Sequence, residues 1–271
     1  MLRSRSTALA VIAALAVGAT LLTALVWWST GGRWYDVRTA SMGRTAPVGA
    51  LLLTRPASAD AVQVGDLVTF RQPDSGKVYT HRAVEVSAGG IRTKGDVNPA
   101  ADPWSIDQAH LVGKVVAVWP AVGWVLRGAP LLLLGLGLVW LVSGLVRASW
   151  RSPVRVVGAA VAFAAVCLLM QPWVGLDRVG VTDTVDGPRL EAVSTGVLPV
   201  RAQLADEMVS PRMRSGEVAR IAVPSDGTRY SVAAVPSLSG WWWVVVAGIC
   251  LAPLLWTLVV GLAPLAREEE Q

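Results

Sequence analysis

The chain has 271 residues, of which 53% are hydrophobic and 16% are charged, and its mean hydropathy is +0.51. This composition excludes a disordered chain and an ordinary soluble globular protein, because most apolar residues lie in a few long blocks. Lys and Arg number 24 against 19 Asp and Glu, but several of these bases lie beside the apolar blocks rather than in one soluble patch. This distribution of basic residues is typical of a protein whose membrane topology they determine, and it argues against nucleic-acid binding.

The first apolar block runs from about Thr7 to Trp28, follows Arg3 and Arg5, and has the length of a membrane span. A cleaved signal peptide is the alternative, although its apolar core is normally shorter. We expect residues 1–28 to form a cytoplasmic N-terminus and a first transmembrane helix.

Short β-rich runs, separated by Pro, Gly and charged residues, follow as far as residue 129. We expect residues 29–129 to form a mostly β, extracytoplasmic domain. Its predicted strands are Ala50–Thr54, Leu67–Arg71, Val78–Val86, Gly90–Thr93 and Val112–Val118.

Two further apolar blocks, Pro130–Val146 and Val154–Met170, flank a short segment that contains Arg147, Arg151 and Arg155. A short Arg-rich loop between two spans is typical of the cytoplasmic side of a membrane, as is an Arg-bearing N-terminus. We therefore expect residues 130–170 to form a transmembrane hairpin with a cytoplasmic loop.

A second polar segment covers residues 171–240 and contains Val-rich runs at Val193–Val200 and Val218–Val223. Turn signals occur at Asp186-Gly187 and Asp226-Gly227. These features predict a second, small β-rich segment on the extracytoplasmic side.

Three tryptophans at residues 241–243 open the last apolar block, which ends near Leu265. Because tryptophan is enriched at membrane interfaces, residues 241–271 are expected to form the last transmembrane helix and a cytoplasmic tail. The predicted fold class is a membrane protein with about four α-helical spans, a mostly β extracytoplasmic catalytic domain and a second small β-rich segment.

The two cysteines, Cys167 and Cys250, lie in apolar blocks, and the chain has only two histidines. We therefore expect no disulfide, no metal site and no organic cofactor.

Three short motifs in the first polar domain carry groups suited to acyl transfer. This chemistry requires a hydroxyl nucleophile, a base of near-neutral pKa and a carboxylate that orients the base. Ser41 supplies the hydroxyl, His81 the base, and Asp96 or Asp102 the carboxylate. Each residue alone has a structural interpretation, since loop serines and aspartates cap turns and strand histidines pack in cores. His110 has no partnering motif around it and is expected to be structural or exposed.

Five runs occur in order along the chain, namely TASMGRTAPVG (39–49), VGDLVTF (64–70), THRAVEV (80–86), TKGDVNPAADPW (93–104) and VGKVVAVWPAVGW (112–124). Together they resemble the type I signal peptidases, and the resemblance covers about residues 20–130. The chain is similar to the branch of this family that has a histidine in place of the lysine base. That Ser-His-Asp branch is found in the endoplasmic reticulum, in archaea and in some Gram-positive bacteria.

The resemblance implies that Ser41 is the nucleophile and His81 the general base. The family motif offers two aspartates for the third role; we prefer Asp102 as the residue that orients His81, with Asp96 as a structural or catalytic support. The oxyanion hole would use the backbone N–H of Ser41 and the hydroxyl of Thr39, which stands where the family usually has serine. In addition, an arginine at position 44 stands where the family commonly has a proline, and we expect this to loosen the loop or to alter the substrate groove.

These roles imply a signal peptidase I, a serine endopeptidase of the cell membrane that cuts exported preproteins on the extracytoplasmic side. Its expected partners are signal peptides and membrane lipid, with the secretion machinery as a further candidate. The alternative is an inert, membrane-anchored binding or assembly protein, because residues 171–240 and the additional spans exceed the simplest members of the family. A transporter is disfavoured, because no Asp, Glu, Lys or His lies in a predicted span. Recruitment of dedicated substrates by residues 171–240 is a further hypothesis.

Overall fold

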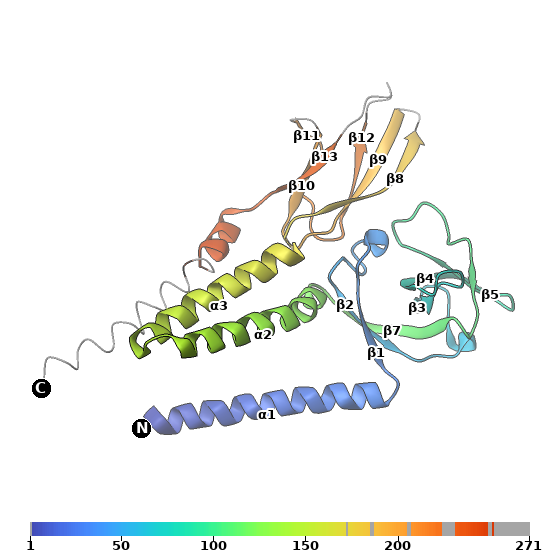
Figure 1. Ribbon diagram of the computed structural model, residues 1–271. Coiled ribbons are helices and arrows are strands. Elements are labelled where there is room, and N and C mark those ends of the chain that lie inside the picture. Colours follow the sequence, from blue (N-terminus) through green and yellow to red (C-terminus); the bar gives the residue numbers. More distant parts are fainter. Residues whose placement is uncertain are drawn as a thin grey trace, which may run out of the picture. The chain divides into compact units, whose positions relative to one another are not determined.

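In the computed structural model of the chain, the described residues are 2–171, 173–184, 187–204, 207–223, 231–248 and 251. They form helices and antiparallel β-sheets (Figure 1). The chain divides into two compact units. The first unit holds the described residues up to Tyr35 together with Leu51–Trp119, and the second holds Asp36–Ala50 together with the described residues from Pro120 onward. The segment that carries Ser41 therefore groups with the second unit, although we expected it within the first polar domain.

The first unit begins with α1 (Leu2–Ser29), a helix of 28 residues that covers the expected first span. The helix ends where two glycines follow at residues 31 and 32. Two tryptophans at this end lie under guanidinium groups, with Arg33 Cζ 5.4 Å from the ring centre of Trp28 and Arg55 Cζ 5.2 Å from that of Trp27. Aromatic and cationic side chains of this kind are typical of a helix end at a membrane interface.

A seven-stranded sheet has the strand order β1-β2-β7-β3-β4-β5-β6. Its strands are β1 (Arg33–Asp36), β2 (Leu51–Arg55), β3 (Leu67–Arg71), β4 (Val78–Ser87), β5 (Gly90–Lys94), β6 (Ser105–Ile106) and β7 (Leu111–Trp119). The five strands predicted from the sequence correspond to β2, β3, β4, β5 and β7, and their bounds differ by at most one residue. Short 3-10 turns occur at η1 (Ala40–Met42) and η2 (Ala59–Ala61).

The core of the first unit lies on one face of this sheet. Alternate residues of a strand point to opposite faces, so His81 and Ala83 of β4 are buried while Val84 is exposed. The buried cluster comprises Val62, Val68, Phe70, Ala83, Ile91, Ile106 and Leu111. The same alternation that fills the core therefore places the imidazole of His81 on the buried face.

Within the described part of the chain, two helices are long and apolar enough to cross a membrane, namely α2 (Val122–Leu145) and α3 (Ala148–Met170). The two helices lie side by side (Figure 1). Their apolar side chains are largely exposed, up to 84% for Leu145, whereas the core helix of a soluble protein is buried. The Nε of Arg155 donates to the Ser143 hydroxyl at 2.9 Å and links the pair.

Both helices begin earlier than the apolar blocks predicted. The helix α2 starts at Val122 and includes Pro130, where we expected the span to begin. The helix α3 starts at Ala148, so Arg151 and Arg155 are helical rather than part of the loop. Hydropathy identifies only the apolar stretch of a helix. The helix itself extends beyond that stretch for as long as the backbone hydrogen bonds of the helix continue.

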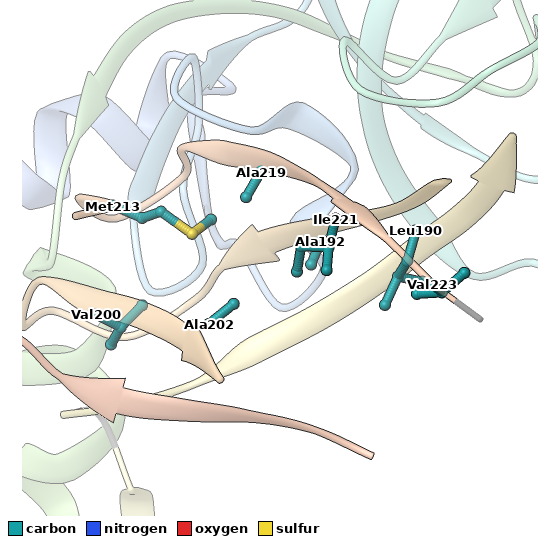
Figure 2. Packing of buried hydrophobic residues seen from close by; sticks show 8 residues of the cluster. All are labelled: Leu190, Ala192, Val200, Ala202, Met213, Ala219, Ile221 and Val223. Carbon is teal, nitrogen blue, oxygen red and sulfur yellow. The ribbon is translucent and has the colours of Figure 1, made fainter. Parts of the chain in front are cut away.

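The second polar segment forms two three-stranded sheets. One sheet has the order β12-β9-β8 and comprises β8 (Leu176–Thr184), β9 (Gly187–Ser194) and β12 (Val218–Ala222). The other has the order β11-β10-β13 and comprises β10 (Val200–Leu204), β11 (Glu207–Met208) and β13 (Val232–Pro236). We call β8–β13 the sandwich domain. Figure 2 shows its core, in which side chains of β9 and β12 gather with those of β10 and with Met213.

The run Val193–Val200 is not one strand. It contains the end of β9 at Ser194, a connection, and the start of β10 at Val200. Residues 240–248 are helical and begin the expected last span. The remainder of that span apart from residue 251, the C-terminal tail, Cys250, Asp186 and the Asp226-Gly227 turn signal lie outside the described residues.

Candidate active site

His81 and Asp102 form a buried hydrogen-bonded pair in the first unit. His81 lies on β4 opposite Val68 of β3, and its Nδ1 is 2.6 Å from the Oδ2 of Asp102. The two residues are only 4% and 6% exposed. The amide of Asp102 donates to the carbonyl of Thr93 at 2.7 Å, which brings the loop after β5 back to the sheet. The fold therefore joins two residues that are 21 positions apart in the chain.

The hydroxyl of Thr93 donates to the same Oδ2 of Asp102 at 2.6 Å. Two donors thus fix the orientation of this carboxylate. Because an ionised carboxylate can only accept hydrogen bonds, Nδ1 carries the proton when the His81 ring is neutral, and Nε2 is the basic nitrogen. This is the tautomer that a general base requires for proton transfer at Nε2.

Two aromatic rings pack beside the imidazole of His81. The Phe70 ring lies edge-on at a centroid distance of 6.0 Å, and the Tyr79 ring lies at the same distance. Trp104, from the run that contains Asp102, lies 6.4 Å from Tyr79. These rings restrict the rotamer of His81 and exclude water from one side of the pair.

Asp96 pairs with Arg82. The guanidinium of Arg82 donates to both carboxylate oxygens of Asp96, at 2.8 and 2.7 Å, and to the carbonyl of Gly65 at 2.8 Å. This bidentate bond raises the pKa of Arg82. Because Arg82 directly follows His81 in β4, the two side chains leave the strand on opposite faces. Of the two aspartates that the sequence offered, the structure places Asp102 at His81 Nδ1 and Asp96 at Arg82.

Ser41 lies in η1, in the second unit. The amide of Gly43 donates to the carbonyl of Ala40 at 2.9 Å and closes the turn. The hydroxyl of Thr39, the residue before the turn, is 3.3 Å from the hydroxyl of Ser41. The two residues expected to form an oxyanion hole are therefore neighbours, and both hydroxyls are part of one local turn.

The segment that carries Ser41 is tied to the start of α2. The Nε of Arg127 donates to Asp36 at 3.0 Å, and the Gly49 backbone packs against the Trp124 ring. Burial acts to raise the pKa of Asp36, but hydrogen bonds from Arg127 and Arg38 outweigh it and hold that pKa below its ordinary value. These contacts fix both ends of the Ser41 segment within the second unit.

His110 forms a second histidine–aspartate pair, with its Nδ1 2.6 Å from Asp107 Oδ1. The pair is exposed, and the hydrogen bonds from His110 lower the pKa of Asp107. Among the described residues, no group of three His, Cys, Asp or Glu side chains is arranged to hold a metal ion.

Thr93 and Arg82 belong to the sequence motifs described above, but the motifs alone predicted no role for either residue. A usable signal was present for Thr93, because alternation along β5 places it on the buried face with Ile91. A buried hydroxyl requires a hydrogen-bond partner, and the partner is Asp102. The role of Arg82 depends on the path of the loop that contains Asp96, which strand periodicity does not specify.

No family model matches the chain, and a search of curated proteins finds no match.

Proposed function

We propose that the protein is a membrane-bound serine endopeptidase, a signal peptidase that removes N-terminal signal peptides from exported preproteins. The observation that carries the proposal is the buried chain Thr93–Asp102–His81, which orients a histidine base with Nε2 as its proton acceptor. The Ser41 turn, with the Thr39 hydroxyl beside it, supports the nucleophile and oxyanion roles.

The reaction then follows the acyl-enzyme route. His81 Nε2 takes the proton of Ser41 Oγ as that oxygen bonds to the scissile carbonyl carbon, and Asp102 stabilises the resulting imidazolium. The Ser41 N–H and the Thr39 hydroxyl donate to the oxyanion of the tetrahedral intermediate. The C–N bond breaks as His81 returns the proton to the leaving amine. His81 then takes a proton from water as the water oxygen bonds to the carbonyl carbon of the Ser41 ester. The C–O bond to Ser41 breaks as His81 returns this proton to Ser41 Oγ, and the signal peptide leaves with a free carboxylate.

The membrane assignment in the proposal is a multi-pass protein of the cell membrane with both polar domains on the extracytoplasmic side. It is supported by the length, composition and exposure of α2 and α3, and by the arginines around their connection. Ser41 follows Trp28 by 13 residues, so an extended chain places it within roughly 45 Å of the membrane. Signal peptides are cut just beyond a membrane-embedded apolar segment, which suits a nucleophile held near the bilayer.

Cleavage of a preprotein with an Ala-x-Ala site by the purified, detergent-solubilised protein tests the proposal. We expect Ser41→Ala and His81→Ala each to lower kcat/KM by about 10³-fold or more. His110→Ala is the matched control and should cleave like wild type. Full activity of Ser41→Ala would refute the proposal. A wild-type protein that cuts no preprotein in a panel would favour the inert assembly protein.

A further inference from the structure

A turn of the sandwich domain packs directly against the loop that carries Ser41. Gly216, in this turn, has a φ of +78°, in the left-handed region that favours glycine. A Cβ at this position would lie 2.4 Å from the carbonyl oxygen of Gly43 and 2.8 Å from the Cα of Arg44. Both contacts are to backbone atoms, so a side chain at residue 216 would have to displace the loop immediately after Ser41.

The same turn contributes a charge to the contact. Glu217 Oε1 lies 3.8 Å from Arg44 Nη1, and Glu217 Oε2 accepts from the Arg214 amide at 2.7 Å. The hydrogen bond from the Arg214 amide orients the Glu217 carboxylate, whereas the side chain of Arg44 is 73% exposed. The ion pair therefore contributes little stability by itself. Its attraction favours the position of the loop in which the backbone of Gly216 contacts Gly43 and Arg44. The strand β8 also contacts η1.

The turn is rigid because the sandwich core holds it. The Gly216 amide donates to the carbonyl of Ser194 at 2.7 Å, and the Ser194 amide donates to the carbonyl of Glu217 at 3.0 Å. Met213 exchanges two backbone hydrogen bonds with Val200, and its side chain lies in the core cluster (Figure 2). A displacement of the turn would therefore disturb both β9 and the start of β10.

We propose that the sandwich domain positions the nucleophile, with Gly216 as the positioning residue that supports the Ser41 loop through Gly43. This inference rests on the proposed function. The amide of Gly43 closes η1, so a shift of Gly43 changes the directions of the Ser41 N–H and of the Ser41 hydroxyl. Misplacement of reacting groups by about 1 Å can lower the rate by about 10²-fold.

Gly216→Ala in the full chain tests the proposal against Gly187→Ala. Gly187 belongs to the same domain and also has a positive φ, +108°, but among the described residues beyond its chain neighbours a Cβ there meets no atom within 4 Å. Both variants carry the backbone strain of alanine in this region, and only Gly216→Ala displaces the Ser41 loop. We expect Gly216→Ala to lower kcat by about 10- to 100-fold with KM nearly unchanged. We expect Gly187→Ala to keep the wild-type kcat.

A charge swap provides a second test that does not require Gly216→Ala to fold. Arg44→Glu should lower kcat through repulsion from Glu217, and Arg44→Glu combined with Glu217→Arg should restore it. Restoration supports positioning, because direct loss of a substrate contact by Arg44 would not be repaired at residue 217.

The proposal is overturned if Gly216→Ala keeps the wild-type kcat, or if Gly187→Ala lowers kcat as much as Gly216→Ala does. It is also overturned if adding Glu217→Arg to Arg44→Glu does not raise kcat. A higher KM at unchanged kcat would also overturn it and would indicate substrate recruitment instead. Each of these results still leaves wild type active and Ser41→Ala inactive. If wild type itself cleaves nothing, the proposed function fails and the positioning role fails with it.

Discussion

The first unit contains two histidine–aspartate pairs whose hydrogen bonds have the same length but whose surroundings differ. In both, Nδ1 lies 2.6 Å from a carboxylate oxygen. The side chains of His81 and Asp102 are 5% and 6% exposed, whereas those of His110 and Asp107 are 36% and 64% exposed. His110 and Asp107 are three residues apart and meet within one local turn, but His81 and Asp102 meet only because the sheet folds. A short hydrogen bond alone therefore does not identify a catalytic pair.

Burial and the third partner distinguish the two pairs. Thr93 donates to Asp102, and the side chains of His81 and Asp102 are buried beside two aromatic rings. The electrostatic attraction between imidazolium and carboxylate is therefore little screened by water. The pair of His110 and Asp107 is surrounded by solvent, where such interactions contribute little. The predictions below test this difference between the pairs.

The largest expected effect is on the carboxylate of the buried pair. Asp102→Asn should lower kcat by about 10³- to 10⁴-fold, because an amide can hold His81 in the wrong tautomer and does not stabilise its charged form. Asp107→Asn is the matched control in the exposed pair and should leave kcat unchanged. Steady-state cleavage kinetics measure both, and equal effects of the two substitutions would contradict the assigned difference.

The hydroxyl of Thr93 is the next element to test. Thr93→Val removes one donor to Asp102 while keeping the side-chain volume, so kcat should fall about tenfold, since a hydrogen bond to a charged group contributes about 1.5–3 kcal/mol. Thr54, which is buried and hydrogen-bonded to Thr69, provides the control. Thr54→Val should lower the free energy of unfolding without changing kcat. A Thr93→Val protein that is destabilised but has the wild-type kcat would exclude a role in orienting Asp102.

Asp96 should contribute to stability more than to catalysis. Asp96→Asn weakens the partly exposed bond to Arg82, and we expect a loss of about 1 kcal/mol in the free energy of unfolding. The kcat should stay within about threefold of wild type, which corresponds to less than about 1 kcal/mol. Thermal unfolding and cleavage kinetics on the same sample separate the two effects. A kcat as low as that of Asp102→Asn would make Asp96 part of the catalytic machinery.

The smallest effect concerns the exposed pair itself. Hydrogen bonds from the side chain and backbone of His110 lower the pKa of Asp107 below 3.8. The interaction therefore stabilises the folded state above pH 3.8 and is lost as pH falls through the lower folded-state pKa. His110→Ala keeps the backbone donor, so the pKa of Asp107 should rise only part of the way to its ordinary value. Carboxyl NMR of the selectively labelled protein measures the pKa of Asp107. If His110→Ala leaves this pKa unchanged, the hydrogen bond between the His110 side chain and Asp107 is ruled out.

The strands of the first unit were predictable because local signals define them. Turn residues bracket each run, and alternation along β4 places His81 on the buried face. The choice between Asp96 and Asp102 was not contained in these patterns. It depends on the hydrogen bond from the Asp102 amide to Thr93, which the path of the loop determines.

The remaining differences also come from contacts between distant residues. The run Val193–Val200 reads as one apolar stretch, but the amide of Leu198 donates to the carbonyl of Trp173 within the connection between β9 and β10. The first turn of α2 also contacts a distant segment, since Gly123 approaches the carbonyls of Gly49 and Ala50 too closely for a side chain. A hydropathy pattern carries no information on either contact.

The central claim is that His81 activates the residue at position 41, and the reactivity of a thiol at that position measures it without a substrate. In a Cys167→Ala, Cys250→Ala background, Ser41→Cys provides one thiol, whose alkylation by iodoacetamide at pH 7 depends on its thiolate fraction. We expect His81→Ala to slow this alkylation by about tenfold or more, and His110→Ala to leave it unchanged. Equal rates with and without His81 would contradict the account.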